Sequence, residues 1–97
     1  MEYGDNKRSV KELIQNWLRS SERKDGYQEA RISALWKEVM GQAVDKHTKR
    51  VRYREGTLTV QLDSAVLREE LSLGKEKIAN LLNERLGENA VLKVVLK

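Results

Sequence analysis

The residues of this sequence best suited to do chemistry are basic ones, gathered between Lys46 and Arg54. That stretch, KHTKRVRYR, holds five Lys and Arg residues and no Asp or Glu. The whole chain has 19 Lys+Arg and 15 Asp+Glu, so removing the five leaves 14 against 15, a net charge of −1. The entire positive surplus therefore lies in one short stretch, and the chemistry it predicts is the binding of phosphate groups.

Arginine recurs at every second position from Arg50 to Arg54, which is the period of side chains that share one face of a β-strand. Such side chains stand about 6.6 Å apart, close to the pitch of phosphates along an extended nucleic-acid strand. The candidate nucleic-acid-binding residues are Lys46, Lys49, Arg50, Arg52, Arg54 and Lys93. Contacts of this kind follow the backbone without reading bases, so binding would be sequence-tolerant and strongly salt-dependent. The alternative is a solvated face, or arginines paired with acids such as Glu29, Glu38 or Glu55.

No constellation in the sequence predicts catalysis. His47 is the single histidine and there is no cysteine, so a transition-metal site would have to rely on carboxylates. We expect His47 to contact the last carbonyls of the preceding helix instead. The chain has no phosphate-binding glycine loop and no nucleophile elbow. These observations predict a protein that is not an enzyme, with no metal, no cofactor and no small-molecule substrate.

Length and composition bound the class of protein. A chain of 97 residues predicts one domain, in which residues 1–8 are expected to be flexible. The absence of cysteine gives no reason to expect an oxidising compartment. The N-terminal residues MEYGDNKRS are not followed by an apolar run, and no stretch approaches the roughly 20 apolar residues that span a bilayer. The expectation is a cytoplasmic protein with no membrane partner.

The first part of the chain is predicted to form two helices. A capping-box pattern from Ser9 to Glu12 and an apolar stripe predict a helix that fades by Ser21. The polar segment Glu22 to Gly26 predicts a connection. A second helix is expected from Tyr27 or Gln28 to about Asp45, continuing across Gly41, with Trp36 on its apolar face.

The basic stretch is predicted to be the first strand of a hairpin. That strand covers Thr48 to Arg54, Glu55-Gly56 forms the turn, and the second strand covers Thr57 to Asp63. Alternation places Leu58, Val60 and Leu62 on the core side of the second strand. In the first strand Val51 and Tyr53 face the core, opposite the three arginines.

One helix and one strand complete the prediction. The helix is expected from Ala65 to Leu86, with Gly74 as a weak point, and the strand from Val91 to Lys97. In that strand Leu92, Val94 and Leu96 are expected to share one face. The order ααββαβ predicts an α+β, two-layer domain with helices on one face of a three-stranded sheet. The last strand is expected beside the first hairpin strand, which would make the basic strand central.

These elements carry a family resemblance over roughly residues 30 to 97. The matching blocks read Trp36-x-x-Val39-Met40-Gly41-x-Ala43-x-x-His47-Thr48, Glu55-Gly56-x-Leu58-x-Val60-x-Leu62-Asp63-Ser64-Ala65, Leu67-x-x-Glu70-Leu71 and Leu81-Leu82-Asn83-x-x-Leu86-Gly87. They resemble the DciA-like domain family, formerly a domain of unknown function. The resemblance implies a KH-like fold, DNA binding, and assistance in placing the replicative helicase on bacterial DNA. It implies no catalytic residues. The segment Gly41-Gln42-Ala43-Val44 is not a GxxG loop, so a KH-type clamp on four nucleotides is not expected.

The leading hypothesis is therefore a non-enzymatic nucleic-acid-binding accessory protein that assists the replicative helicase. Its partners would be DNA, single- or double-stranded, and the helicase itself. Two alternatives stay open on the sequence: a protein-interaction module that binds no nucleic acid, and an RNA-binding KH-like factor.

Overall fold

The computed structural model describes residues 21–97, so the helix expected from Ser9 to Ser21 and the flexibility expected of residues 1–8 lie outside the described residues. The described elements are helices α2 (Ser21–Met40) and α3 (Gln42–Lys46), strands β1 (Thr48–Arg54) and β2 (Thr57–Leu62), helices α4 (Ala65–Ser72) and α5 (Lys75–Leu86), and strand β3 (Lys93–Leu96). The predicted α+β class is confirmed, with a sheet of three strands.

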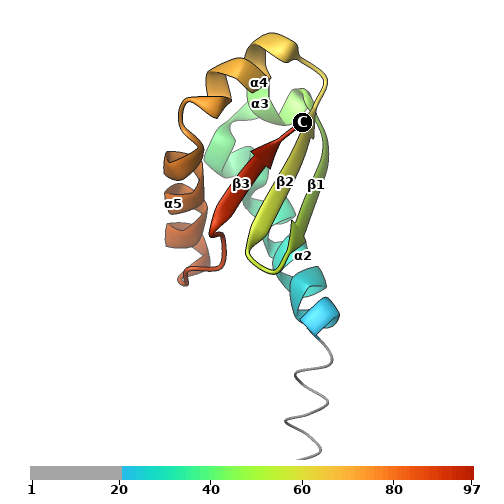
Figure 1. Ribbon diagram of the computed structural model, residues 1–97, viewed down its shortest axis with the longest axis vertical. Helices are drawn as coiled ribbons and strands as arrows, with labels where there is room; N and C mark the ends of the chain where they lie inside the picture. The colour runs from blue at the N-terminus through green and yellow to red at the C-terminus, as the bar shows by residue number, and fades with distance from the viewer. Residues whose placement is uncertain (1–20) are drawn as a thin grey trace, which may run out of the picture.

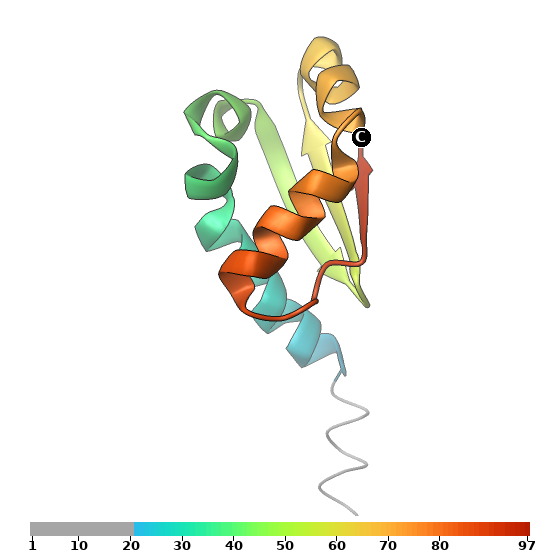
Figure 2. The ribbon, with the colours of Figure 1, turned by 90° about the vertical axis from the view of Figure 1, so that its left-hand side faces the viewer.

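The helices and the sheet form two layers. Helices α2 and α5 lie on one face of the sheet, and no described element covers the opposite face (Figures 1 and 2). The core lies between the layers and is built from side chains less than one tenth exposed. It joins Ile32 and Trp36 of α2, Leu58 and Val60 of β2, Ile78 and Leu82 of α5, and Val91 and Val94 around β3. One sheet face is therefore occupied by packing, and the other has no helix or strand of residues 21–97 against it.

Helix α2 begins earlier than the sequence predicts. The segment Glu22 to Gly26, expected to be a connection, is helical. Two carboxylates of its first turns accept backbone hydrogen bonds from the hairpin: Tyr53 N–H donates to Glu29 at 2.8 Å, and Glu55 N–H donates to Asp25 at 3.2 Å. These tertiary contacts offset the cost of Gly26 inside the helix, which is about 1 kcal/mol relative to alanine.

Gly41 divides the predicted second helix into α2 and α3. Its φ of 91° lies in the left-handed region, which glycine adopts without steric cost. The turn lets α3 carry Val44 back against the core, where a relay of hydrogen bonds fixes it. Trp36 Nε1–H donates to Thr48 Oγ1 at 2.9 Å, and the Thr48 hydroxyl donates to the Val44 carbonyl at 2.7 Å.

The predicted hairpin is confirmed over β1 and β2. Arg54 pairs with Thr57, so Glu55 and Gly56 form a two-residue turn. Both have positive φ, 47° and 85°, as a type I′ turn requires. A Cβ atom on Gly56 would also lie 2.9 Å from Leu92 Cδ1, so a larger residue would displace the Leu92 side chain in addition to straining the backbone.

The predicted strand order is wrong. The order is β1-β2-β3, and β3 pairs parallel with β2 in the register Thr57 with Lys93 and Thr59 with Val95. The apolar strand β2 is thus central, and the basic strand β1 is an edge. The physical reason is that α4 and α5 form a crossover that returns the chain to the neighbour of the strand it left. Charged side chains also suit an edge better than the middle of a sheet.

The predicted helix from Ala65 to Leu86 is two helices. Helix α4 ends at Ser72 and α5 begins at Lys75, with Leu73 and Gly74 between them. Ser64 caps α4 as its side chain accepts from Leu67 N–H at 3.2 Å. The break at Gly74 changes the helix direction so that Ile78 and Leu82 of α5 pack on the sheet.

The last strand is shorter than predicted, and Leu92 does not share a face with Val94. Leu92 is 75% exposed and its side chain covers Gly56, whereas Val94 is buried. Asn83 explains where the strand begins. Its amide donates to the Val91 carbonyl and accepts from Val91 N–H, each at 2.8 Å, and so holds the segment ahead of β3 to α5.

Candidate nucleic-acid interface

The uncovered side of the sheet carries most of the residues that the sequence selected. The pairing register arranges its side chains in three rows: Arg54, Thr57 and Lys93; Arg52, Thr59 and Val95; and Arg50 with Gln61. Lys97 lies beside Gln61, because its N–H and carbonyl bond to Val60 and Leu62 of β2. We call these nine residues the open face. Basic side chains stand on β1 and β3, and neutral polar side chains lie between them on β2.

The open face is hollowed in two places. One hollow, of about 130 Å³, is lined by Arg50, Arg52, Thr59, Gln61 and Lys97. The other, of about 250 Å³, is lined by Arg52, Arg54, Thr57, Thr59 and Lys97. Guanidinium, ammonium, hydroxyl and amide groups all donate hydrogen bonds, and neither hollow is lined by an acidic side chain. This donor set matches the oxygens of phosphate and sugar.

The basic residues of the open face have no charged partner among residues 21–97. None of Arg50, Arg52, Arg54, Lys93 and Lys97 forms an ion pair with any residue from 21 to 97. Basic residues elsewhere do: Arg31 pairs with Glu88 at 3.1 Å, and Arg85 pairs with Glu38. Like charges concentrated on one surface repel one another, so this arrangement suits an anionic ligand better than stability.

The three acids expected as alternative partners are not partners of the arginines. Glu38 pairs with Arg85, and Glu29 accepts the Tyr53 backbone N–H. Glu55 lies in the hairpin turn and makes no ion pair within the described range. The pairing alternative is therefore wrong for these residues, and the arginines remain available to a ligand.

Lys49 lies at an irregularity that removes it from the arginine row. The register of β1 shifts between Thr48 and Arg50, which is a β-bulge, so Lys49 and Arg50 are both exposed. Lys49 Nζ lies 3.2 Å from Asp63 Oδ2, and His47 Nδ1 lies 2.7 Å from Asp63 Oδ1. The hydrogen bond from His47, followed by that from Lys49, lowers the pKa of the Asp63 carboxyl. The Lys49 ammonium is thus paired with the Asp63 carboxylate, unlike the arginines of β1.

Two other expectations from the sequence need correction or addition. The ring of His47 bonds to Asp63, not to helix carbonyls; only its backbone N–H reaches Val44 O, at 3.1 Å. Lys46 is exposed at the end of α3, ahead of the strand. Lys97, which was not among the candidate residues, belongs to the open face. The signal for it was the alternation Lys93, Val95, Lys97, which continues the outward face of the last strand.

Tyr53 faces the helices, as predicted. Its hydroxyl donates to the Ala90 carbonyl at 2.7 Å, and burial raises the pKa of the phenol. The open face therefore carries no aromatic side chain on which a base could stack. In the part of the chain that the structure describes, no three His, Cys, Asp or Glu residues are placed to hold a metal ion.

Fold and site together define a small two-layer domain whose free sheet face is basic and whose other face is a packed helical layer. A family model, described as the Dna[CI] antecedent, DciA, matches residues 9–96, and the chain belongs to this family. The family is one of helicase-loader-type accessory proteins in bacterial DNA replication, and it is not a catalytic family. A search of the curated proteins found no match. Among residues 21–97, no helix has the length and apolar character needed to cross a membrane.

Proposed function

We propose that this protein is a non-enzymatic accessory factor that assists the replicative helicase and binds DNA through the open face. The observation that carries the proposal is the set of five unpaired basic side chains on the open face, where no acidic residue lies. Family membership supports the helicase as partner. The cytoplasm, where replication takes place in bacteria, is the proposed location.

The geometry of the open face suits a nucleic-acid backbone. Arg50, Arg52 and Arg54 are spaced about 6.6 Å apart along β1, near the spacing of phosphates in an extended strand. Lys93 of β3 and Lys97, which follows the strand, lie two strand spacings away, about 10 Å, across the Thr57 and Thr59 hydroxyls. Phosphates could thus be held at the edges while sugars lie over the polar centre.

This surface would bind without reading sequence. Base readout requires an element that enters a groove, or stacking and hydrogen bonding to exposed bases. The open face is a sheet surface with cationic edges and no aromatic residue, so its contacts are electrostatic. Affinity should depend steeply on salt and little on base composition.

The experiment is a fluorescence-anisotropy titration of labelled single- and double-stranded DNA and RNA over a salt series. We expect the variant R50Q/R52Q/R54Q to bind DNA at least about ten-fold more weakly than the parent. The slope of log affinity against log salt should fall by about two for single strands, because three phosphate contacts are lost.

A charge-matched control separates the open face from net charge. The variant R23Q/K37Q/R68Q removes three basic residues from α2 and α4, away from the open face. It should bind DNA within about two-fold of the parent. Equal loss in both variants would show that only the net charge matters, and the assignment of the open face would be wrong.

The helicase part of the proposal is tested separately. We propose that helical surfaces contact the helicase, so R50Q/R52Q/R54Q should still be retained by the immobilised hexameric helicase of the same organism. If that variant loses the helicase and no nucleic acid binds even at low salt, the open face is a protein-docking surface. Preferential binding of RNA would favour the RNA-binding alternative.

A further inference from the structure

Strand β3 has one edge that pairs with no other strand of the described residues. On its inner side Lys93 N–H donates to Gly56 O at 3.1 Å and Lys97 N–H donates to Val60 O at 2.9 Å. Successive residues of a strand direct their N–H and C=O groups to opposite edges, so Val94 and Leu96 direct theirs outward. No further strand of residues 21–97 lies there. The edge therefore presents two N–H and two C=O groups in the spacing of a β-ladder.

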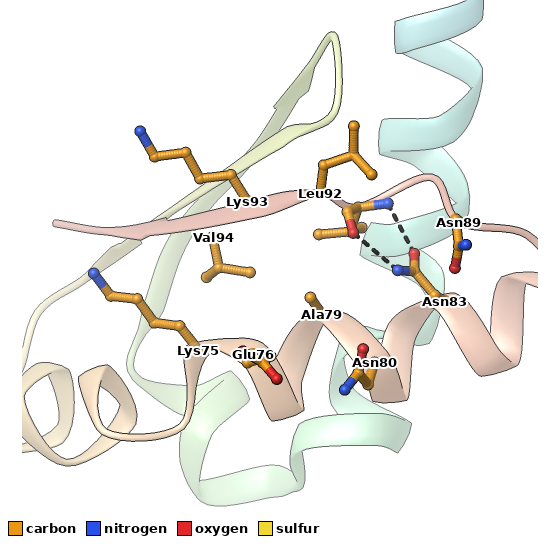
Figure 3. A pocket seen from close by; sticks show the side chains of 10 residues that line it. Lys75, Glu76, Ala79, Asn80, Asn83, Asn89, Leu92, Lys93 and Val94 are labelled. Atoms are coloured by element: carbon orange, nitrogen blue, oxygen red, sulfur yellow. Dashed lines mark hydrogen bonds between the residues drawn. The ribbon is translucent and has the colours of Figure 1, made fainter.

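A groove of about 480 Å³ lies along this edge, between β3 and α5 (Figure 3). Val94 and Ala79 point into it, Lys75 lies at one end, and Asn80 lies toward the other. The two hydrogen bonds between Asn83 and Val91 join α5 to the segment just ahead of β3. They therefore fix the distance between the helix and the start of the strand. The groove is therefore built into the fold, with an apolar floor below a free strand edge.

The surroundings of the edge are cationic. Lys75 and Lys93 line the groove against one acid, Glu76, and Lys97 directly follows the strand. None of these three lysines forms an ion pair with a described residue. Figure 3 shows Lys93 pointing away from α5 and Val94 pointing toward it. A strand added here would thus meet apolar side chains on its groove side and lysines on its other side.

We propose that β3 binds an extended acidic segment of a partner protein as a fourth strand of the sheet. The backbone of that segment pairs with Val94 and Leu96. Its alternate apolar side chains enter the groove over Val94 and Ala79, and the acidic side chains between them lie beside Lys93 and Lys97. Backbone pairing supplies affinity and the alternation supplies specificity.

Charge and shape favour this occupant over two others. A second copy of the chain that paired Val94 with Leu96 in antiparallel register would bring Lys93 of each copy opposite Lys97 of the other, and like charges directly opposite are destabilising. A nucleic acid has no alternating N–H and C=O groups to match the edge. The groove is also lined by no aromatic side chain on which a base could stack.

The test is amide exchange measured by NMR on the ¹⁵N-labelled full chain, with an end-capped octapeptide of alternating valine and glutamate as probe. We expect the amides of Val94 and Leu96 to exchange at least about ten-fold more slowly when the peptide is bound. The same peptide methylated on every backbone nitrogen keeps its charge, but it can no longer donate to the Val94 and Leu96 carbonyls, and its N-methyl groups block the approach of a paired strand. It should therefore not protect these amides. A valine–lysine peptide should not bind.

Matched variants separate this site from the open face. K75E should weaken binding of the acidic peptide by about five-fold, because it reverses a charge at the groove. R52E, on the open face, should leave peptide binding unchanged while it weakens DNA binding. The two proposals can therefore fail independently.

Three results would overturn the inference. Val94 and Leu96 could remain unprotected at saturating peptide. Their protection could grow with protein concentration alone, which would identify a second copy as the occupant. Lastly, single-stranded DNA could shift the resonances of Ala79 and Asn80 and compete with the peptide in the R52E variant, which would identify nucleic acid.

Discussion

At the scale of single residues, Thr48 joins the helical layer to the basic strand. Its hydroxyl accepts from Trp36 Nε1–H and donates to the Val44 carbonyl. Trp36 is 1% exposed, so its N–H has no access to water. The relay therefore anchors the start of β1, from which Arg50, Arg52 and Arg54 project.

Replacing Thr48 by valine keeps the side-chain volume and removes the relay. We expect T48V to lower the free energy of unfolding by about 1–3 kcal/mol, because a buried donor loses its acceptor. Urea denaturation followed by tryptophan fluorescence measures the change. The same substitution at Thr57, on the open face, should stay within about 0.5 kcal/mol of the parent. Equal effects at the two positions would contradict a special role for the hydroxyl of Thr48.

Residue patterns predicted the open face well where the strand is regular. Arg50, Arg52, Arg54 and Lys93 lie where a period of two places them. Lys49 does not, because the β-bulge inserts a residue that no local pattern marks. Its ion pair with Asp63 joins residues from the two ends of the hairpin, and that contact exists only once β1 and β2 are paired.

At the scale of elements, the hairpin turn contains an avoidable strain. Glu55 has φ of 47°, a left-handed conformation that costs a residue with a side chain about 1 kcal/mol. Asparagine adopts this conformation more readily and is preferred at this position of a type I′ turn.

We therefore expect E55N to raise the free energy of unfolding by about 0.5–1 kcal/mol. Thermal denaturation should show a rise in Tm of about 2–8 °C. E55Q is the matched control, because it removes the same charge without the preference for a left-handed backbone. If E55Q stabilises the protein as much as E55N does, the charge and not the turn geometry is the cause.

The prediction of elements from sequence succeeded for the hairpin and failed at glycines and in topology. Gly26 does not interrupt α2, because Asp25 and Glu29 bond to the hairpin. Gly74 does separate α4 from α5. Both glycines look alike in sequence, and only tertiary contacts distinguish them. Strand order depends likewise on where the crossover returns, which periodicity does not encode.

At the scale of the whole molecule, charge is distributed by layer. The helical layer carries ion pairs that join α2 to α5 and to the segment after it, namely Arg85 with Glu38 and Arg31 with Glu88. The open face carries the unpaired cations. A surface arranged for binding an anion should therefore cost the free protein some stability.

This cost predicts that R50Q/R52Q/R54Q is more stable than the parent at low salt. The expected gain is about 0.5 kcal/mol at 0.01 M ionic strength and less at 1 M, where charges are screened beyond about 3 Å. Urea denaturation at the two salt concentrations measures it. The control R23Q/K37Q/R68Q should show a smaller gain. A loss of stability in the open-face variant would mean that the arginines contribute to the fold.

The parallel pairing of β2 with β3 has a consequence for the order of folding. The hairpin closes over two residues, a local event on the microsecond scale. The pairing of β3 must instead close a segment of about thirty residues, from Leu62 to Lys93, and loop closure of that length carries a larger entropic barrier. We expect α2 and the hairpin to be ordered in the folding transition state and β3 to join afterwards. Until it does, the edge of the apolar strand β2 is open to pairing with other chains, and the pairing of β3 is the step that closes it.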